Sequence, residues 1–279
     1  MPELPEVETI RLLLQSDLIG KTIKDVTVMV QKQFVGNKAD IIGKKIDSLI
    51  RKGKVVSIKL DNGLFISFHL KLSGQLLFAK DKYNAVFANT IPLTSTNKMP
   101  GKTTSIILDF TDGSALFFND LRKFGWMKIG QEPEGPKSVD VLSPDFTQEF
   151  LQTKITKSKK PIKTLLMDQE ALAGIGNIYA NDSLYEAKIN PERKASTLTT
   201  EEINALYASI KKVIAKGLQY RGSSAKDEIY ILPDGSKGTY QNHFRVYHRE
   251  GQPCGRCENP IKRIKQGGRS SFYCPMCQQ

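Results

Sequence analysis

The four cysteines of the chain have the spacing of a zinc site. Cys254 and Cys257 form one C-x-x-C pair, Cys274 and Cys277 form a second, and sixteen residues separate the pairs. Four thiolates at this spacing are typical of a zinc ribbon, in which they close a tetrahedral site, so the metal is structural. Two disulfides are the alternative, but they need an oxidising compartment, which nothing else in the chain indicates. We therefore predict one structural Zn²⁺ ion.

The first residues carry a second pattern, in which two prolines alternate with two glutamates before a predicted amphipathic helix. Proline and glutamate both suit the first turn of a helix, so the pattern also fits a simple helix start. If Met1 is removed, however, Pro2 presents a secondary amine beside the carboxylate of Glu3. An amine nucleophile with an adjacent acid can form a Schiff base with a sugar carbon.

Two further segments have residues suited to phosphate. Two glycines precede Asn177 between predicted helices, and we expect Asn177 to cap a new helix whose exposed amides could hold a phosphate. By itself such a segment is more often only a turn. Arg269 would lie at the tip of the ribbon, whose five cations face a single acid, Glu258. This balance indicates an element that grips a nucleic-acid backbone.

Length and charge limit the class of protein. A chain of 279 residues has room for two domains and a small third module. The formal net charge of +12 indicates a polyanionic partner, with nucleic acid the leading candidate. No stretch approaches the ~20 apolar residues of a membrane helix, and the acidic N-terminus is unlike a signal peptide. An anionic membrane surface would need a basic amphipathic helix, of which the sequence holds no strong example.

The first half of the chain predicts antiparallel β-sheet, as a sandwich or barrel. Residues 55–60 and 64–72 have the pattern of one hairpin, and residues 105–110 and 114–118 that of another. Within 64–72 apolar and polar residues alternate, so one face is expected to be buried and the other, with His69, to meet solvent or a ligand.

The second half predicts α-helix. Proline and glycine gather at residues 130–136, where we place a domain boundary. Residues 199–202 match a capping box at the start of a long helix. The residues that share one face of this helix are Ile203, Leu206, Ile210, Val213 and Ile214.

Four segments, in their order along the chain, together resemble one family. Met1–Thr9, Asp168-Gln169, Gly174–Tyr179 and the two C-x-x-C pairs are similar to bacterial formamidopyrimidine-DNA glycosylase, also called 8-oxoguanine DNA glycosylase. The resemblance spans nearly the whole chain. It implies an α+β fold: an N-terminal antiparallel β-sandwich domain, a helix-two-turn-helix domain and a C-terminal four-cysteine zinc ribbon, with damaged DNA bound between domains. The domains are expected at residues 1–134, 145–248 and 249–279.

The resemblance also implies the catalytic residues. Pro2 would attack C1′ of the flipped damaged nucleotide, and Glu3 would be the acid that assists opening of the deoxyribose. Glu6 would be a supporting carboxylate near the amine. Lys54, close to the lesion-side phosphates, and Arg269 complete the implied set. Taken alone, Lys54 also fits a solvated strand end.

By the same resemblance, Arg122 and Phe124 would insert into the DNA double helix at the position that the flipped base has left, and Leu72 would be the third inserted residue, or wedge. Such wedges offset part of the few kcal/mol that flipping costs. Without the family, Phe124 would fit a core and His69 an ordinary surface histidine. Ser223 and Ser224 would belong to the loop that covers the flipped base. The implied DNA-binding residues are His69, Arg122, Lys163, Asn177 and Tyr247.

Three segments depart from the family pattern. Leu72 stands where the family usually has methionine, and its alternation with the preceding apolar residues also allows a core role. Residues 102–105 replace the usual Lys-His-x-His stretch, and residues 221–228 differ from the usual glycine- and threonine-rich lesion loop. The last departure concerns lesion preference and leaves the chemistry as expected.

The expected protein is a bifunctional DNA glycosylase and abasic-site lyase of base excision repair. It would remove oxidised purines through a Pro2 Schiff base and cleave the strand by β- and δ-elimination. We expect a monomer that binds damaged double-stranded DNA and no membrane, in the bacterial cytoplasm and associated with the nucleoid. The alternatives are the related oxidised-pyrimidine endonuclease, whose opening usually has glycine at the position of Leu4, a catalytically silent DNA-damage binder, and an RNA-binding ribbon protein, for which the usual aromatic signature is missing.

Overall fold

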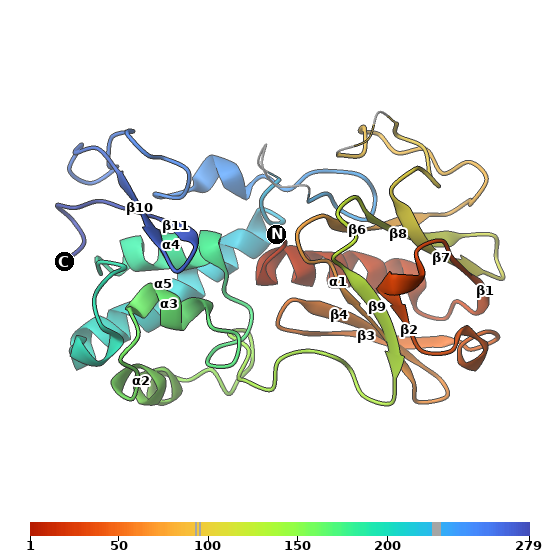
Figure 1. Ribbon diagram of the computed structural model, residues 1–279, viewed down its shortest axis with the longest axis horizontal. Helices are drawn as coiled ribbons and strands as arrows, with labels where there is room; N and C mark the ends of the chain where they lie inside the picture. Colours follow the sequence, from red (N-terminus) through yellow and green to blue (C-terminus); the bar gives the residue numbers. More distant parts are fainter. Residues whose placement is uncertain (93, 95, 225–229) are drawn as a thin grey trace. The chain divides into compact units, whose positions relative to one another are not determined.

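The computed structural model describes all of residues 1–279 except 93, 95 and 225–229 (Figure 1). The chain forms two compact units. Unit 1 comprises Met1–Gly135 and Tyr220–Gln241, and unit 2 comprises Pro136–Gln219 and Asn242–Gln279. Within the described residues, no helix is both long enough and apolar enough to cross a membrane.

Unit 1 is a β-sandwich with one long helix, which confirms the expected N-terminal sandwich. One sheet has the strand order β1-β7-β8-β6 and the other has the order β2-β9-β5-β4-β3, and only β2 and β9 pair in parallel. Short 3-10 helices occupy Gln31–Gln33 and Lys38–Asp40. The other elements are α1 (Leu4–Leu18), β1 (Ile23–Val28), β2 (Phe34–Val35), β3 (Ile46–Lys52), β4 (Val55–Leu60), β5 (Phe65–His69), β6 (Gly74–Ala79), β7 (Thr104–Phe110), β8 (Ala115–Asp120) and β9 (Trp126–Gly130).

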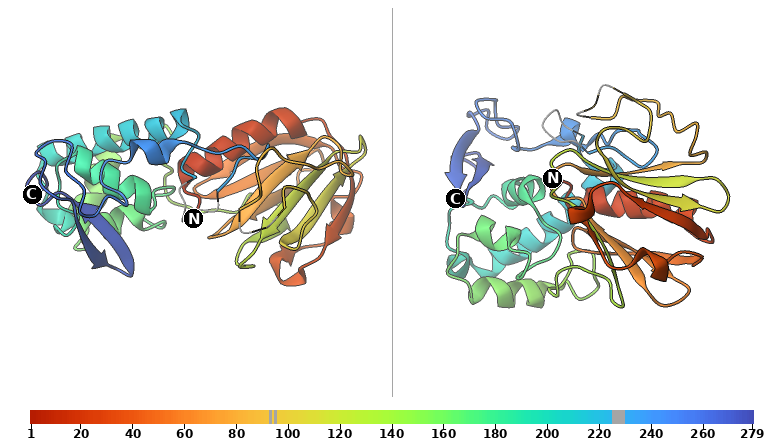
Figure 2. Two further views of the ribbon diagram at one scale, coloured as in Figure 1. Left: turned by 90° about the horizontal axis from the view of Figure 1, so that it is seen from above. Right: turned by 45° about the vertical axis from the view of Figure 1, so that its right-hand side comes forward.

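The core of unit 1 joins α1 to both sheets. Val7, Ile10 and Leu14 recur at helical spacing on α1 and are fully buried in one cluster with side chains of both sheets. Figures 1 and 2 show α1 between strands of the two sheets. On its outer side, α1 is tied to β3, because Arg51 Nε donates to Glu8 Oε2 at 2.9 Å. The N-terminal helix is therefore part of the sandwich core.

Both predicted hairpins are present, since β4 pairs with β5 and β7 pairs with β8. The strand predicted over 64–72 nevertheless ends at His69, where the chain turns. Its polar face is also less open than expected. Ser67 is buried, bonds to Ser57 at 2.8 Å and accepts the backbone N–H of Glu134 at 3.2 Å, so the linker covers this part of the sheet.

The segment at 220–241 returns to unit 1. Ile231 is buried in a second cluster with Phe87 and Ile91, which belong to the long connection between β6 and β7. The backbone N–H of Phe78 in β6 donates to Pro233 O at 2.9 Å. Residues that follow the long helix of unit 2 are therefore held against the sandwich.

Unit 2 contains the other α-helices, including the long α5 (Thr200–Gln219), and the cysteine ribbon, as expected. The capping box at the start of α5 is reciprocal: Glu202 Oε2 accepts the N–H of Thr199 at 2.8 Å, and Thr199 Oγ1 accepts the N–H of Glu202 at 3.3 Å. The five predicted face residues of α5 are all buried. Short 3-10 helices occupy Ala195–Thr197 and Tyr240–His243, the latter reaching into unit 1. The other elements are α2 (Gln148–Thr156), α3 (Ile162–Met167), α4 (Asn177–Glu186), α5 (Thr200–Gln219), β10 (Lys262–Gln266) and β11 (Arg269–Tyr273).

One capping prediction was wrong. Gly176, with extended backbone, is the N-cap of α4, and Asn177 is already its first helical residue. The backbone O of Asn177 accepts from Asn181 Nδ2 at 2.6 Å, one turn further along the helix. Asn177 thus lies at the helix start, but its side chain does not cap it.

Candidate functional site

Pro2 and Glu3 lie at the start of α1. Glu3 is the N-cap, its carboxylate accepts the N–H of Glu6, and Glu6 Oε2 accepts the N–H of Glu3 at 2.9 Å. This capping box fixes the backbone that follows Pro2. Pro2 and Glu3 are buried, and Glu6 is fully buried. The bonds that start the helix therefore also hold the predicted nucleophile and acid next to one another.

The second oxygen of Glu6 bonds to the segment at 220–241. Glu6 Oε1 accepts the N–H of Ser223 at 2.8 Å. Gly222 has a φ of +75°, and a Cβ added there would lie 2.7 Å from Glu6 Oε1. Only glycine fits this close approach without displacing the carboxylate. Glu6 thus connects the start of α1 to the beginning of the predicted lesion loop.

Tyr230 and Ser224 hold the two ends of that loop together. The Tyr230 hydroxyl donates to Glu6 O at 3.3 Å and to Arg221 O at 3.1 Å, and Ser224 Oγ donates to Tyr230 O at 2.8 Å. Burial, and then the nearby charge of Glu6, raise the pKa of Tyr230 well above its usual value, so the hydroxyl stays a donor. Residues 225–228 of the predicted loop lie outside the described residues.

Lys54 and His69 lie close together at one end of the five-stranded sheet. Lys54 is buried, so it is not a solvated strand end, and Val55 beside it pairs with His69. His69 Nδ1 accepts the N–H of Lys71 at 3.0 Å. Burial, followed by the charges of Lys71 and Lys54, lowers the pKa of His69 to about 3. His69 is therefore neutral near pH 7 and carries its proton on Nε2, where the ring can donate.

The three predicted wedge residues lie in two turns that cross between the sheets. Leu72 is half-buried in the turn at 70–73, after β5 has ended, so a core position in a longer strand is wrong. Arg122 and Phe124 lie in the turn at 121–125, and Phe124 is 59% exposed, which excludes a core role for it. Asp120, which the sequence reasoning missed, lies at the start of the second turn.

In unit 2, the ribbon presents Arg269 beside a hollow. Gly267 and Gly268 both have positive φ between the paired residues Gln266 and Arg269, the geometry of a two-residue hairpin. Arg269 is exposed directly after this tip. The adjoining hollow has a volume of about 330 Å³. It is lined by Lys163, Thr164, Met167, Asp168, Gln266, Gly267 and Arg269.

Buried side chains fix the ribbon against the helices of unit 2. Lys163 Nζ donates to Ser270 O and Ser271 Oγ, both at 2.8 Å, so this predicted phosphate ligand also fastens α3 to β11. Asn181 Oδ1 accepts the N–H of Phe272 at 2.7 Å. Contacts from α3 and α4 therefore hold β11, which begins directly after the ribbon tip.

Asp182 positions the predicted contact Tyr247. Its carboxylate accepts the N–H groups of Arg245, Val246 and Tyr247 at 3.1, 3.1 and 3.3 Å. The Tyr247 ring packs edge-on against Phe272 at a centroid distance of 5.4 Å. Sequence reasoning missed Asp182, because neither its burial nor its backbone donors can be read from the sequence.

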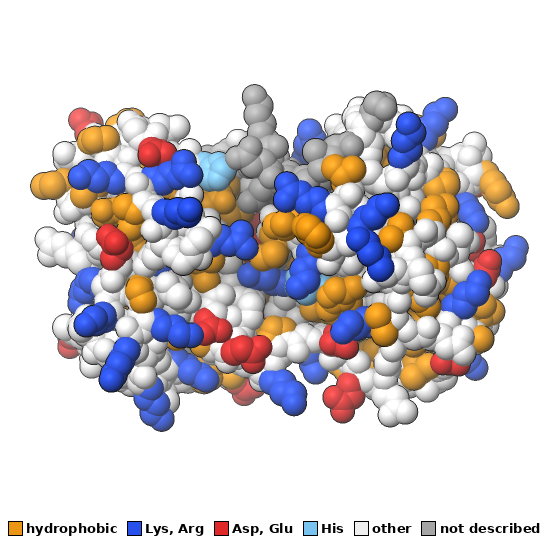
Figure 3. Space-filling view, viewed as in Figure 1, with side chains coloured by type: hydrophobic (Ala, Val, Ile, Leu, Met, Phe, Trp, Pro, Cys, Tyr) orange, Lys and Arg blue, Asp and Glu red, His pale blue; other side chains and the backbone are white. Residues whose placement is uncertain are grey.

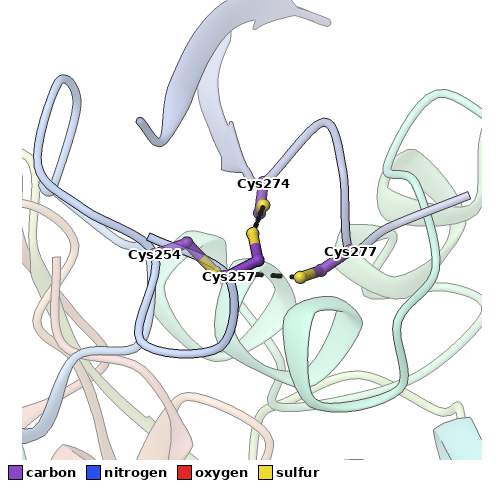
Figure 4. A group of neighbouring side chains, drawn as sticks. All are labelled: Cys254, Cys257, Cys274 and Cys277. Atoms are coloured by element: carbon purple, nitrogen blue, oxygen red, sulfur yellow. Dashed lines mark hydrogen bonds between the residues drawn. The ribbon is translucent and has the colours of Figure 1, made fainter. Parts of the chain in front are cut away.

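The four cysteines converge as a metal site (Figure 4). Their sulfur atoms all lie within 4.8 Å of one another, with Cys257 Sγ and Cys274 Sγ 3.4 Å apart and Cys254 Sγ and Cys277 Sγ 3.9 Å apart. A tetrahedral Zn²⁺ with Zn–S bonds of about 2.3 Å needs sulfur separations of about 3.8 Å. The described cysteines therefore fit one zinc ion.

Tyr185 supports this cluster. Its hydroxyl lies 3.3 Å from Cys254 Sγ, and burial, followed by that contact, raises the pKa of Tyr185. A protonated hydroxyl can donate to a thiolate ligand and orient it. Arg256 is not a free cation of the ribbon, because its Nη1 donates to Tyr185 O at 2.6 Å. Elsewhere, Lys and Arg side chains are spread over the faces of both units drawn in Figure 3 and outnumber the acidic side chains there.

Comparisons with known proteins agree with these sites. The formamidopyrimidine-DNA glycosylase from Pelotomaculum thermopropionicum is 39% identical over 291 residues, covering 100% of this chain and 99% of that protein. The relative from Carboxydothermus hydrogenoformans is 37% identical, with 100% of each chain covered. The chain belongs to the formamidopyrimidine-DNA glycosylase family. It is thus a DNA glycosylase of base excision repair, as the sequence analysis expected.

Family profiles and solved structures give the same assignment. The N-terminal domain of formamidopyrimidine-DNA glycosylase matches residues 1–127, its H2TH domain matches residues 137–228, and the zinc finger found in FPG and IleRS matches residues 251–279. The MutM (Fpg) protein from Thermus thermophilus has a TM-score of 0.86 at 31% identity, over 99% of this chain and 98% of that chain. The Lactococcus lactis Fpg in complex with abasic-site DNA has a TM-score of 0.85 at 28% identity, with full coverage of both chains.

Membership of the formamidopyrimidine-DNA glycosylase family confirms the fold class and the single structural zinc. Within unit 1, the structure brings together Pro2, Glu3 and Glu6 with Ser223, and separately Lys54 with His69. Unit 1 also holds Leu72, Arg122 and Phe124 in its two turns. Unit 2 holds Lys163, Asn177, Tyr247 and Arg269, around the ribbon and the start of α4. Their individual roles stay predictions.

Proposed function

We propose that the protein is a bifunctional glycosylase and abasic-site lyase that releases 8-oxoguanine and formamidopyrimidines from double-stranded DNA. The observation that carries this proposal is the buried arrangement of Pro2 against the capping box of Glu3 and Glu6. A helix start needs only the capping box. Proline at position 2, directly after a removable Met1, adds a nucleophile that the helix does not require.

The proposed reaction begins when removal of Met1 turns the Pro2 nitrogen into a secondary amine. The amine attacks C1′, the glycosidic bond breaks, and the proton lost from nitrogen goes to the departing base. Glu3 then donates its proton to the sugar ring oxygen as the C1′–O4′ bond breaks. The product is an open-chain sugar joined to Pro2 as an iminium ion, with Glu3 left as a carboxylate.

Strand cleavage follows from the iminium ion. Its positive charge acidifies the C2′ proton, whose loss expels the 3′ phosphate. Loss of a second sugar proton, from C4′, then expels the 5′ phosphate, and water releases Pro2 from the sugar. The sequence of bonds broken is that of β- and δ-elimination, and each step is driven by the electron-withdrawing nitrogen.

Phosphate contacts are proposed for both units. In unit 1, Lys54 and the Nε2–H of His69 supply a cation and a neutral donor close together. In unit 2, the start of α4 at Asn177 is proposed as a phosphate contact, because the positive end of a helix dipole favours an anion. Arg269 borders the hollow next to Lys163, and Tyr247 is proposed as a further backbone contact.

Base recognition is proposed for the turns and for the loop tied to Glu6. Leu72, Arg122 and Phe124 would fill the space that the flipped nucleotide leaves. Ser223 and Ser224 would contact the extruded base. The partner is damaged duplex DNA, and we propose a monomer in the bacterial cytoplasm, associated with the nucleoid. The proposed domains are residues 1–134, 145–248 and 249–279.

The test is borohydride trapping on a duplex that contains 8-oxoguanine, with the adduct mapped by mass spectrometry. We expect reduction to fix the sugar to Pro2 in protein whose intact mass lacks Met1. Glu3→Gln keeps the shape of the side chain, so it should bind DNA but lose most base excision. An adduct on another residue, or full activity with Met1 retained, would contradict the mechanism.

A parallel duplex with an oxidised pyrimidine tests the substrate class. Faster excision of the pyrimidine than of 8-oxoguanine would assign the chain to the related endonuclease activity. Tight binding without trapping on either duplex would identify a silent damage binder instead.

A further inference from the structure

The two turns that carry the proposed wedge residues are held as a pair. Residues 70–73 connect β5 to β6, and residues 121–125 connect β8 to β9, so both turns cross from one sheet to the other. At one end His69 pairs with Trp126, and at the other Gly74 pairs with Asp120. The sheets therefore fix both ends of each turn.

The carboxylate of Asp120 bonds to both turns and is fully buried. Its Oδ1 accepts the hydroxyl of Ser73 in the first turn and, at 3.2 Å, the N–H of Arg122 in the second. Its Oδ2 accepts the N–H of Gly125 at 2.7 Å and the side-chain amide of Gln33 at 2.9 Å. Ser73 Oγ also accepts the N–H of Arg122 at 3.0 Å. One carboxylate thus closes a network through both turns.

The backbone of both turns is strained in the same way. Lys71 and Lys123 have φ values of 50° and 54°, and each directly precedes an apolar wedge, Leu72 or Phe124. Non-glycine residues rarely adopt this left-handed conformation, and it persists only where surrounding contacts enforce it. Space is also short, because a Cβ at Gly125 would lie 2.8 Å from a backbone carbonyl oxygen. The hydrogen bonds of Asp120 can hold the backbone of both turns in this conformation.

We propose that Asp120 is a positioning residue for base flipping, which locks the two turns so that Leu72, Arg122 and Phe124 enter the duplex as one preformed wedge. This inference rests on the wedge role in the proposed function. A buried carboxylate with four donors is rigid, since any donor left without it costs free energy. A rigid wedge loses little conformational freedom on insertion, so more of its contact energy can offset unstacking.

The test uses Asp120→Asn, which keeps size and shape. Either orientation of the new amide places an N–H against the backbone N–H of Arg122 or of Gly125, so the network cannot be satisfied. Single-turnover excision of a paired 8-oxoguanine should fall about tenfold. Cleavage of a preformed abasic site, which needs less unstacking, should change by less than about twofold. A 2-aminopurine next to the lesion should report slower opening of the stack.

The matched control is Asp109→Asn. Asp109 is also a buried carboxylate of the four-stranded sheet, but it pairs with Lys82 at 2.7 Å. Asp109→Asn removes one buried negative charge, as Asp120→Asn does. We expect it to slow excision and abasic-site cleavage by the same factor, or to slow neither. Ser73→Ala removes one hydrogen-bonded bridge between the turns and should cause the same selective loss of excision to a smaller extent. It replaces Asp120→Asn as the test if that variant does not fold.

A double variant separates this inference from the proposed function. If Asp120 acts through the wedge, Asp120→Asn should add less than about twofold to the loss already caused by Phe124→Ala. If Phe124→Ala loses both activities equally, the wedge role and this inference both fail. If Phe124→Ala is selective while Asp120→Asn is not, or if their losses multiply, only the role of Asp120 is overturned.

Discussion

Glu6 accepts the backbone N–H of Ser223 at 2.8 Å, which joins the first turn of α1 to a segment more than two hundred residues later in the chain. The same carboxylate accepts the N–H of Glu3 at 2.9 Å. One buried side chain therefore bonds to the backbone of Glu3, the proposed acid, and of Ser223, at the start of the proposed lesion loop.

Gly222→Ala tests that connection. A Cβ at Gly222 would lie 2.7 Å from Glu6 Oε1, so alanine should push the loop from the carboxylate and slow 8-oxoguanine excision about tenfold. Gly113→Ala is the control, because Gly113 has a similar φ of +87° but nothing within 4 Å of the added Cβ. Single-turnover rates and melting temperatures of both variants show whether the contact between Gly222 and Glu6 affects excision. Equal behaviour of the two variants would remove Glu6 from loop positioning.

His69 predicts a specific pH dependence of stability. Its pKa is about 3 in the folded protein, against an ordinary value of 6.5, so the fold favours the neutral ring. The stability that this provides is complete above pH 6.5 and is lost as the pH falls from 6.5 towards 3. His69→Asn should therefore lose less stability than the wild type between about pH 7 and about pH 5, as measured by urea unfolding.

The reporter for this experiment is Trp126, the single tryptophan of the chain, whose ring lies 5.6 Å from that of His69. Native Trp126 fluorescence should show no titration step between about pH 5 and about pH 8. The exposed His248 provides the control substitution, His248→Asn. A native-state step near pH 6.5 that His69→Asn abolishes would show that the ring is not held neutral.

Zinc removal should act on the ribbon and spare the sandwich. Cys274→Ser, or a chelator, should release one zinc ion per chain and unfold the hairpin, because the metal joins the two C-x-x-C pairs that flank it. Lys163 then loses Ser270 and Ser271, and affinity for DNA should fall at least about tenfold. Trp126 fluorescence should stay native. Met276→Ala, at a 62% exposed position between the last two cysteines, should retain the metal. Active protein without zinc would contradict the structural role.

Substitutions of Arg269 and Phe124 should separate binding of the DNA backbone from flipping of the damaged base. Arg269→Ala removes a proposed phosphate contact, so it should weaken damaged and undamaged duplexes about equally and lower the salt slope by about one unit. Phe124→Ala should leave nonspecific affinity nearly intact and slow excision of a paired 8-oxoguanine more than cleavage of an abasic site. Single-turnover rates on both duplexes at two salt concentrations make the comparison. Equal losses on both substrates for Phe124→Ala would reject the wedge.

Local patterns in the sequence were sufficient for the elements whose stabilising contacts are local. The hairpin of β4 and β5 follows from alternation around a short turn, and the capping box of Thr199 and Glu202 lies within four residues. The cysteine spacing likewise determined the zinc site, because the two C-x-x-C pairs supply all four ligands. Among these local patterns, the cap of α4 was predicted wrongly, since Gly176 is the N-cap in place of Asn177.

Only the tertiary structure decided which distant residues meet. Nothing in the periodicity of residues 64–72 ends the strand at His69, because that end is set by the crossing of the chain to the other sheet. The return of residues 220–241 to the sandwich, the second contact of Glu6 and the four donors around Asp120 are all long-range. A buried carboxylate has no sequence signature for its partners, since its donors are backbone groups that every residue carries. The sequence therefore determined the chemistry available to this protein, and the packing of the sandwich determined where that chemistry is held.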